Sequence, residues 1–231
     1  PQTPNPKPQT PNPKPLGGLG VYNNLVRHMG QNHPQPEPLL QNAQVQQLPR
    51  LKVLLWGTVN VGKTSLLNRY RGEDYNDNIR STIGLDFFFV QSKYKDMRLM
   101  IWDTVPTGRF QINMTPFFKY TQVLILTFDT TDRQSFEMLD RYYRDFMDYH
   151  SRDGISPVRA DASYVYTGHI QILLIGNKND LKDKRAVTVE EAEIWAENRD
   201  MFYLDTSAKE EKYEVLIAKL EEVIDKLKLS Q

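Results

Sequence analysis

One eight-residue segment constrains the fold of this chain more than any other. Residues 57–64, GTVNVGKT, fit the pattern G-x-x-x-x-G-K-[ST], between the apolar run at 51–56 and the helix-like sequence at 65–71. Glycines let such a backbone curl so that successive N–H groups face phosphate oxygens, and the following helix adds the positive end of its dipole. We predict a phosphate-binding loop in which Lys63 reaches the terminal phosphates and the Thr64 hydroxyl ligates Mg²⁺. The alternative is an ordinary strand–turn–helix corner with an incidental lysine.

The rest of the sequence from residue 50 onward alternates between strand-like and helix-like segments. Continuous apolar runs at 122–128 and 170–176 are typical of strands that helices cover on both faces. This alternation predicts an α/β three-layer fold with a mainly parallel sheet. Helices are expected at 133–149, 190–198 and 211–227, and a hairpin of strands at 87–94 and 98–102. The last helix carries an apolar stripe at helical spacing, made of Tyr213, Leu216, Ile217, Leu220, Val223, Ile224 and Leu227.

The first 49 residues differ from the rest in composition. They hold 11 of the 14 prolines, and residues 1–14 are PQTPNPK written twice. Proline removes backbone donors and favours extended chain, so we expect residues 1–49 to be a disordered tail and residues 50–231 to form one domain. The tail is either a plain spacer or a ligand for a domain with an aromatic groove.

Composition excludes several classes of function. Lys+Arg and Asp+Glu are both 29, and a net charge of zero argues against general nucleic-acid binding. With no cysteine, the chain has no disulfide, thiolate metal site or prenyl anchor as given. No apolar run reaches the roughly 20 residues of a membrane span, so we expect a soluble, cytoplasmic protein.

A second motif predicts which base is bound. Residues 177–180 read N-K-N-D directly after an apolar run, at the edge of a parallel sheet where ligands bind. A carboxylate accepts two parallel hydrogen bonds, and guanine offers N1–H and N2–H₂ in that arrangement whereas adenine does not. Asp180 is therefore expected to select guanine. Residues 206–209, TSAK, follow after one more expected strand.

These motifs, with Ser81-Thr82-Ile83-Gly84 and Trp102-Asp103-Thr104, resemble the Ras superfamily of small GTPases in order and spacing, over residues 51–229. The segments at 129–136, DTTDRQSF, and 81–87 are most similar to the Rab branch. The resemblance implies the small G-domain, a P-loop NTPase fold with a six-stranded mixed sheet and five helices. It also implies GTP or GDP with Mg²⁺ as cofactors, and a GTPase switch in vesicle-trafficking-like signalling.

The resemblance assigns roles to individual residues. Thr82 and Asp103 join Thr64 at the Mg²⁺, and Thr82 also senses the γ-phosphate. At the other end of the site, Tyr75 lies against the guanine ring and Lys178 covers the base. Asn177 braces the phosphate loop, and the Ala208 N–H meets the guanine O6. The residues expected to bind nucleotide are Gly57, Asn60, Val61, Gly62, Lys63, Thr64, Ser65, Tyr75, Thr82, Asn177, Lys178, Asp180, Ser207, Ala208 and Lys209.

Three departures from the family bear on hydrolysis. Pro106 replaces the glycine whose N–H bonds the γ-phosphate, and Thr107 replaces the glutamine that orients the attacking water. Val59 stands where Gly or Ser is typical. Of the two expected catalytic residues, Lys63 is the family's lysine, but the side chain of Thr107 is too short to orient the attacking water. We therefore expect slow hydrolysis. The alternative is a pseudo-GTPase scaffold that binds nucleotide without cycling, and an ATP-using kinase is disfavoured by Asp180.

The resemblance also predicts partners. Effectors, exchange factors and activating proteins are expected to bind a monomer through the switch segments and the aromatic residues Phe87, Trp102 and Phe117, which could instead be ordinary packing. Such partners could recruit the protein to endomembranes. Residues 150–169 form an insertion relative to the family, expected to be a surface loop that either docks a partner or packs down.

Overall fold

The computed structural model describes residues 48, 50–77, 86–92, 97–104, 114–152 and 169–227. Several expectations lie outside these residues: the tail at 1–47 and 49, Thr82, Pro106, Thr107 and most of the insertion. The insertion's first three residues, 150–152, belong to a helix and not to the expected loop. No helix within the described ranges is both long and apolar enough to cross a bilayer.

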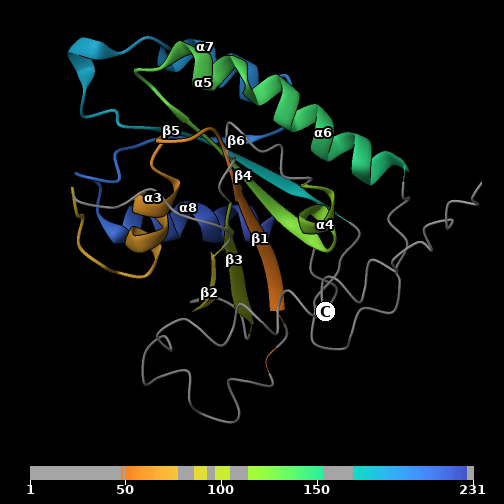
Figure 1. Cartoon of the computed structure of the whole chain (residues 1–231). Coiled ribbons are helices and arrows are strands. Elements are labelled where there is room, and N and C mark those ends of the chain that lie inside the picture. The colour runs from red at the N-terminus through yellow and green to blue at the C-terminus, as the bar shows by residue number, and fades with distance from the viewer. Residues whose placement is uncertain are drawn as a thin grey trace, which may run out of the picture. The chain divides into compact units, whose positions relative to one another are not determined.

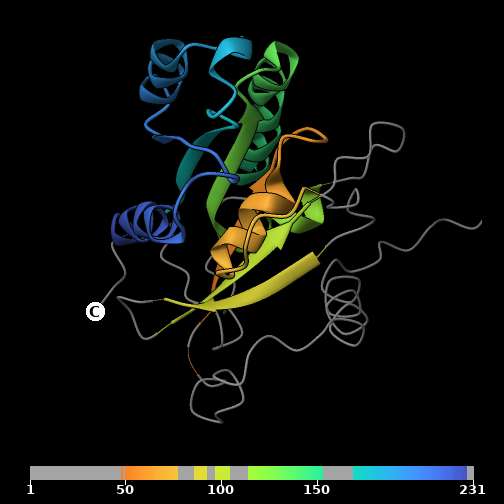
Figure 2. The same ribbon diagram turned by 90° about the vertical axis from the view of Figure 1, so that its left-hand side faces the viewer.

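A six-stranded mixed sheet forms the centre of the fold (Figure 1). Its strand order is β2-β3-β1-β4-β5-β6, and only the β2–β3 pair is antiparallel. Figure 2 shows β2, in yellow, at the edge of the sheet. The bounds are Arg50–Trp56 for β1, Asp86–Gln91 for β2, Arg98–Asp103 for β3, Thr121–Asp129 for β4, Gln171–Asn177 for β5 and Phe202–Asp205 for β6. The small G-domain fold expected from the sequence is confirmed.

Helices follow the strands as the alternation predicts. The single helix expected at 133–149 is two segments with Met138 between them, although the Met138 N–H still bonds the carbonyl of Gln134. The sequence analysis did not identify α4. The segments are α3 (Lys63–Tyr70), α4 (Thr115–Phe118), α5 (Arg133–Glu137), α6 (Leu139–Arg152), α7 (Val189–Glu197) and α8 (Tyr213–Asp225), with a 3₁₀ turn η2 at Lys182–Lys184.

The alternation of side chains along each strand divides the core between the two faces. On one face, β1 places Leu51, Val53 and Leu55 against α3 and α8, which lie side by side in Figure 1. The expected stripe of α8 is buried there from Leu216 onward. On the other face, Trp56 stacks on Tyr142 of α6, with ring centroids 4.6 Å apart. Burying both faces fixes the register of the sheet, and with it the height at which each strand ends.

Candidate nucleotide-binding site

The phosphate loop turns back sharply between β1 and α3. Gly62 has φ +91°, and a Cβ there would lie 2.2 Å from Nδ2 of Asn177. A Cβ on Gly57 would lie 2.2 Å from the carbonyl oxygen of Thr127 in β4. Both glycines of the motif are therefore required by space, and at Gly62 also by a left-handed backbone. A side chain at either position would collide with β4 or with Asn177 and distort the loop.

Lys63 and Thr64 begin α3, directly after Gly62. The Lys63 ammonium donates to the carbonyls of Gly57 and Thr58, at 2.9 and 2.7 Å. Burial lowers the pKa of Lys63 to about 8, while the nearby charge of Asp103 opposes that shift. The ammonium thus lies inside the loop, where a terminal phosphate would be held.

Two oxygen ligands suited to Mg²⁺ meet beside the loop. The Thr64 hydroxyl donates to Oδ2 of Asp103, the last residue of β3, at 2.7 Å. Mg²⁺ prefers carboxylate, hydroxyl and phosphate oxygens, so this pair fits the metal. The third expected ligand, Thr82, lies outside the described residues.

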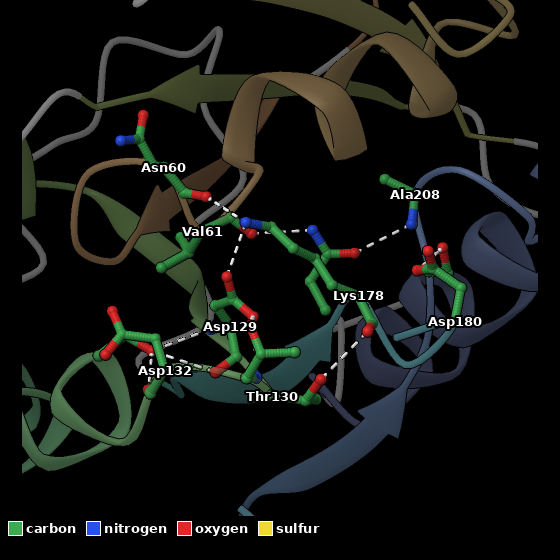
Figure 3. A network of polar contacts seen from close by, with 12 residues as sticks. Asn60, Val61, Asp129, Thr130, Asp132, Lys178, Asp180 and Ala208 are labelled. Atoms are coloured by element: carbon green, nitrogen blue, oxygen red, sulfur yellow. Dashed lines mark hydrogen bonds and ion pairs between the residues drawn. The ribbon is translucent and has the colours of Figure 1, made fainter. Parts of the chain in front are cut away.

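Asn177 links the phosphate loop to the loop after β6. Its Nδ2 donates to the carbonyl of Val61 at 2.8 Å, and its Oδ1 accepts from the N–H of Ala208 at 2.9 Å. Figure 3 shows Val61 and Ala208 on either side of this link. Two loops that lie more than 140 residues apart in the sequence are thus joined through one buried amide, as expected for Asn177.

Asp180 is held by the loop after β6. Its Oδ1 accepts from the Ser207 hydroxyl at 2.5 Å, and that hydroxyl accepts from the N–H groups of Lys209 and Glu210. Ser207 was expected to bind nucleotide, and in the structure it contacts Asp180. The Ser207 hydroxyl thus contacts the carboxylate that is expected to select guanine.

Tyr75 lies close to the same carboxylate. Burial raises the pKa of its phenol, as do the charge and hydrogen bond of Asp77 and the charge of Asp180. The Lys209 ammonium lies 5.9 Å from the centre of the Tyr75 ring. Lys209 thus lies near the Tyr75 ring, and the charge of Asp180 acts on the Tyr75 phenol.

A network of polar contacts supports residues 178–181, the loop between β5 and η2, which we call the base loop. The Arg185 guanidinium donates to both carboxylate oxygens of Asp205, at 3.0 and 2.7 Å. The Tyr203 hydroxyl donates to Oδ1 of Asp205, and Nδ2 of Asn179, the variable position of N-K-x-D, donates to Oδ2 at 3.3 Å. These residues stiffen the loop that presents Asp180. The sequence analysis did not identify them, because partners in such a network are distant in sequence.

The expected effector aromatics pack against one another. Phe87 stacks on Trp102 at 4.9 Å between ring centroids, and Trp102 lies 6.0 Å from Phe117. Trp102 and Phe117 are buried, whereas Phe87 is partly exposed. The packing alternative thus describes Trp102 and Phe117 well, and Phe87 is the accessible member of the three.

Val59 and Asn60 lie at the exposed tip of the phosphate loop. The side chain of Val59 is 44% exposed, and Asn60 has φ +65°. The Asn60 carbonyl accepts from the Lys178 ammonium at 2.8 Å. Ser65 follows in the first turn of α3.

Comparison with known proteins agrees with this geometry. A model of the Ras family matches residues 52–227. The Ras-related protein Rab-9B of Homo sapiens is 38% identical over 164 residues, which are 70% of this chain and 75% of that protein. The Ras-related protein Rab-30 of Homo sapiens is 34% identical over 161 residues, 69% of this chain and 71% of that protein. The Ras-related protein Rab-9A of Rattus norvegicus is 33% identical over 162 residues, 69% and 74% of the two chains.

Proposed function

This chain belongs to the Ras family of small GTPases, on its Rab branch, and from that premise we propose that it is a guanine-nucleotide switch that binds GTP or GDP with Mg²⁺ and hydrolyses GTP slowly. The observation that carries the proposal is the junction at Asn177, which ties the phosphate loop to the loop that orients Asp180. The proposed phosphate site and the proposed guanine-selective carboxylate would thereby be held at a fixed separation.

The residues present fit both the nucleotide and the metal. The loop from Gly57 to Gly62 has the tight backbone that its two glycines permit, and the ammonium of Lys63 lies within it. Thr64 and Asp103 would hold Mg²⁺, which supplies positive charge next to the phosphates when bound. Lys63 would hold the terminal phosphates, and Asp180 would orient the base.

Slow hydrolysis follows from three residues. Val59 exposes a branched side chain at the tip of the phosphate loop, where a water and an activating arginine need room. Pro106 has no N–H to donate to a γ-phosphate, and the Thr107 hydroxyl is too short to reach the water that a glutamine would orient. Each substitution removes a contribution to the chemical step, while Lys63, Thr64 and Asp180 remain to hold the nucleotide.

Single-turnover hydrolysis of GTP with Mg²⁺ tests this proposal. The parent protein should bind GTP tightly and hydrolyse it about tenfold or more slowly than a triple variant carrying Val59→Gly, Pro106→Gly and Thr107→Gln. Equal rates in the two proteins would contradict the explanation. The parent's own Val59, Pro106 and Thr107 also favour a second candidate, a scaffold that binds nucleotide without cycling. A complete absence of GTP turnover in the parent would support this scaffold instead of the switch.

The proposal includes a trafficking context. As a Rab-branch member, the protein would bind effectors, exchange factors and activating proteins, and these would bring it to endomembranes. The partly exposed ring of Phe87, backed by the buried Trp102, is the contact that supports an effector surface. Loss of effector binding in Phe87→Ala, with nucleotide binding unchanged, is the expected result.

A further inference from the structure

Asp129, the last residue of β4, forms an ion pair with Lys178 of the base loop. The Lys178 ammonium lies 2.6 Å from Oδ2 of Asp129 and also donates to the Asn60 carbonyl at 2.8 Å. Figure 3 shows the ammonium between these two groups. We propose that Asp129 is a positioning residue that holds Lys178 across the nucleotide site and so slows nucleotide release. This inference rests on the proposed function.

The carboxylate of Asp129 is itself fixed. Its Oδ1 accepts from the N–H of Thr131 at 2.8 Å and from the Thr131 hydroxyl at 2.7 Å. This is the side-chain-to-backbone turn that aspartate forms with the residue two positions later. One carboxylate oxygen is therefore held by the turn, and the other is directed at Lys178.

The backbone of Lys178 is held by the same turn. The N–H of Thr130 donates to the carbonyl of Asn177 at 2.9 Å, and the Thr130 hydroxyl donates to the carbonyl of Lys178 at 3.2 Å. Lys178 has φ +68°, a left-handed conformation that a residue with a Cβ adopts only when its surroundings impose it. Residues 129–131 thus fix Lys178 at both its side chain and its main chain.

Partial burial makes this ion pair more than an ordinary surface contact. The side chain of Asp129 is 11% exposed and that of Lys178 is 32% exposed, so solvent screens the pair less than it screens exposed charges. A lysine ammonium is carried on a flexible four-carbon stem, and without a charged partner it would turn toward water. Asp129 keeps the stem in the one orientation that spans from β4 to the phosphate loop.

Asp129→Asn tests the ion pair selectively. Asparagine retains an oxygen that can accept from Thr131, so the turn survives, but it removes the charge that faces Lys178. Release of a fluorescent GDP analogue from the full chain should be roughly tenfold faster than in the parent, as expected for the loss of one charge-assisted contact. The matched control is Asp132→Asn, three residues away, because Asp132 caps α5 through Gln134 N–H and asparagine caps equally well. The control should release GDP at the parent rate.

Two further measurements separate positioning from a structural effect. In a Lys178→Ala background, Asp129→Asn should cause no additional acceleration, because the partner through which it acts is gone. The variant should also accelerate release of GDP and of inosine diphosphate by the same factor, because Asp180, which reads the 2-amino group, is untouched. If Asp129→Asn does not fold, Asp129→Ser, whose hydroxyl can accept from the Thr131 N–H, tests the same loss.

The outcomes distinguish this inference from the function beneath it. If Lys178→Ala accelerates GDP release and Asp129→Asn does not, the positioning role is wrong while guanine-nucleotide binding stands. The role is equally wrong if the two substitutions accelerate release additively, or if Asp129→Asn changes the ratio of GDP to inosine diphosphate release. If the parent itself does not bind GDP, the proposed function fails first.

Discussion

Thr64 and Asp103 are joined by a hydrogen bond across 39 residues of sequence, and the sheet explains why they meet. In the register of the parallel pair β1–β3, Asp103 lies opposite Leu55, two residues before the phosphate loop begins. The end of β3 therefore lies beside the start of α3. Because both faces of these strands are buried, a slip in register would disrupt the packing of the core and would also separate Thr64 from Asp103.

This pair predicts how nucleotide release depends on metal. Chelation of Mg²⁺ with EDTA should accelerate GDP release from the parent about tenfold or more, which corresponds to about 1.4 kcal/mol. In Asp103→Asn the release should already be fast and respond little to EDTA. Glu191→Gln, which removes a carboxylate from a surface ion pair with Arg133, should behave as the parent does. An undiminished EDTA response in Asp103→Asn would show that Asp103 does not support the metal.

Base selectivity should depend on Asp180. Asp180→Ala leaves the guanine N1–H and N2–H₂ without their acceptor, so GDP affinity should fall roughly 100-fold or more while ADP affinity is unchanged. Ser207→Ala should lower GDP affinity less, about fivefold, because it frees the carboxylate without removing it. Calorimetry with both nucleotides measures these effects, and an intact preference for GDP in Asp180→Ala would refute the assignment.

Among the described residues, two glycines have positive φ, and they offer a matched test of the phosphate loop. Gly72→Ala, at φ +82° with open space around it, should cost about 1 kcal/mol of stability from backbone strain alone. Gly62→Ala, at φ +91°, should cost roughly 1–3 kcal/mol more, because the new Cβ displaces the amide of Asn177 from both of its hydrogen bonds. Urea unfolding compares the two. Equal losses would mean that Asn177 adjusts freely.

Lys52 predicts a pH dependence of stability. It is buried in β1, donates to the carbonyls of Phe117 and Lys119, and its pKa is lowered by burial to about 7 from 10.5. Between these values the unfolded chain binds the extra proton, so the destabilisation caused by burying Lys52 shrinks as pH rises from about 7 to 10.5, by at most about 1.4 kcal/mol per unit. Below that window this destabilisation is largest and no longer changes with pH.

The comparison is with Lys52→Met, in which this destabilisation disappears. The loss of two hydrogen bonds shifts the variant's unfolding free energy by an amount that does not change with pH. Lys63 titrates in both proteins, so it cancels in the difference between the two curves. Urea unfolding from pH 7 to 10 should show the parent gaining on the variant, whereas parallel curves would mean that Lys52 stays charged in the folded state.

The sequence was most informative where a mechanism requires particular residues. Gly62, Lys63 and Asp180 were singled out from the sequence because curled backbone, phosphate charge and guanine geometry each demand one residue type, and the structure gives Gly62 the expected left-handed backbone. The apolar runs predicted β1, β4 and β5 because strands buried on both faces admit few polar residues.

What escaped prediction depends on partners that tertiary structure supplies. Asp129 ends an apolar run at the same sheet edge as Asn177, a signal that could have found it, but its partner Lys178 is 49 residues away. The break at Met138 involves neither glycine nor proline, so no local residue indicated it. From the sequence, Trp102 and Phe117 were equally compatible with a partner surface and with the core. Their burial in the folded protein distinguishes these alternatives.

The three loops that follow β1, β5 and β6 are tied together by the Asn177 amide and by the hydrogen bond between Asp180 and Ser207. A displacement of one of these loops would therefore be passed to the other two. On the proposed function, the phosphate end and the base end of the site should tighten or loosen as a unit.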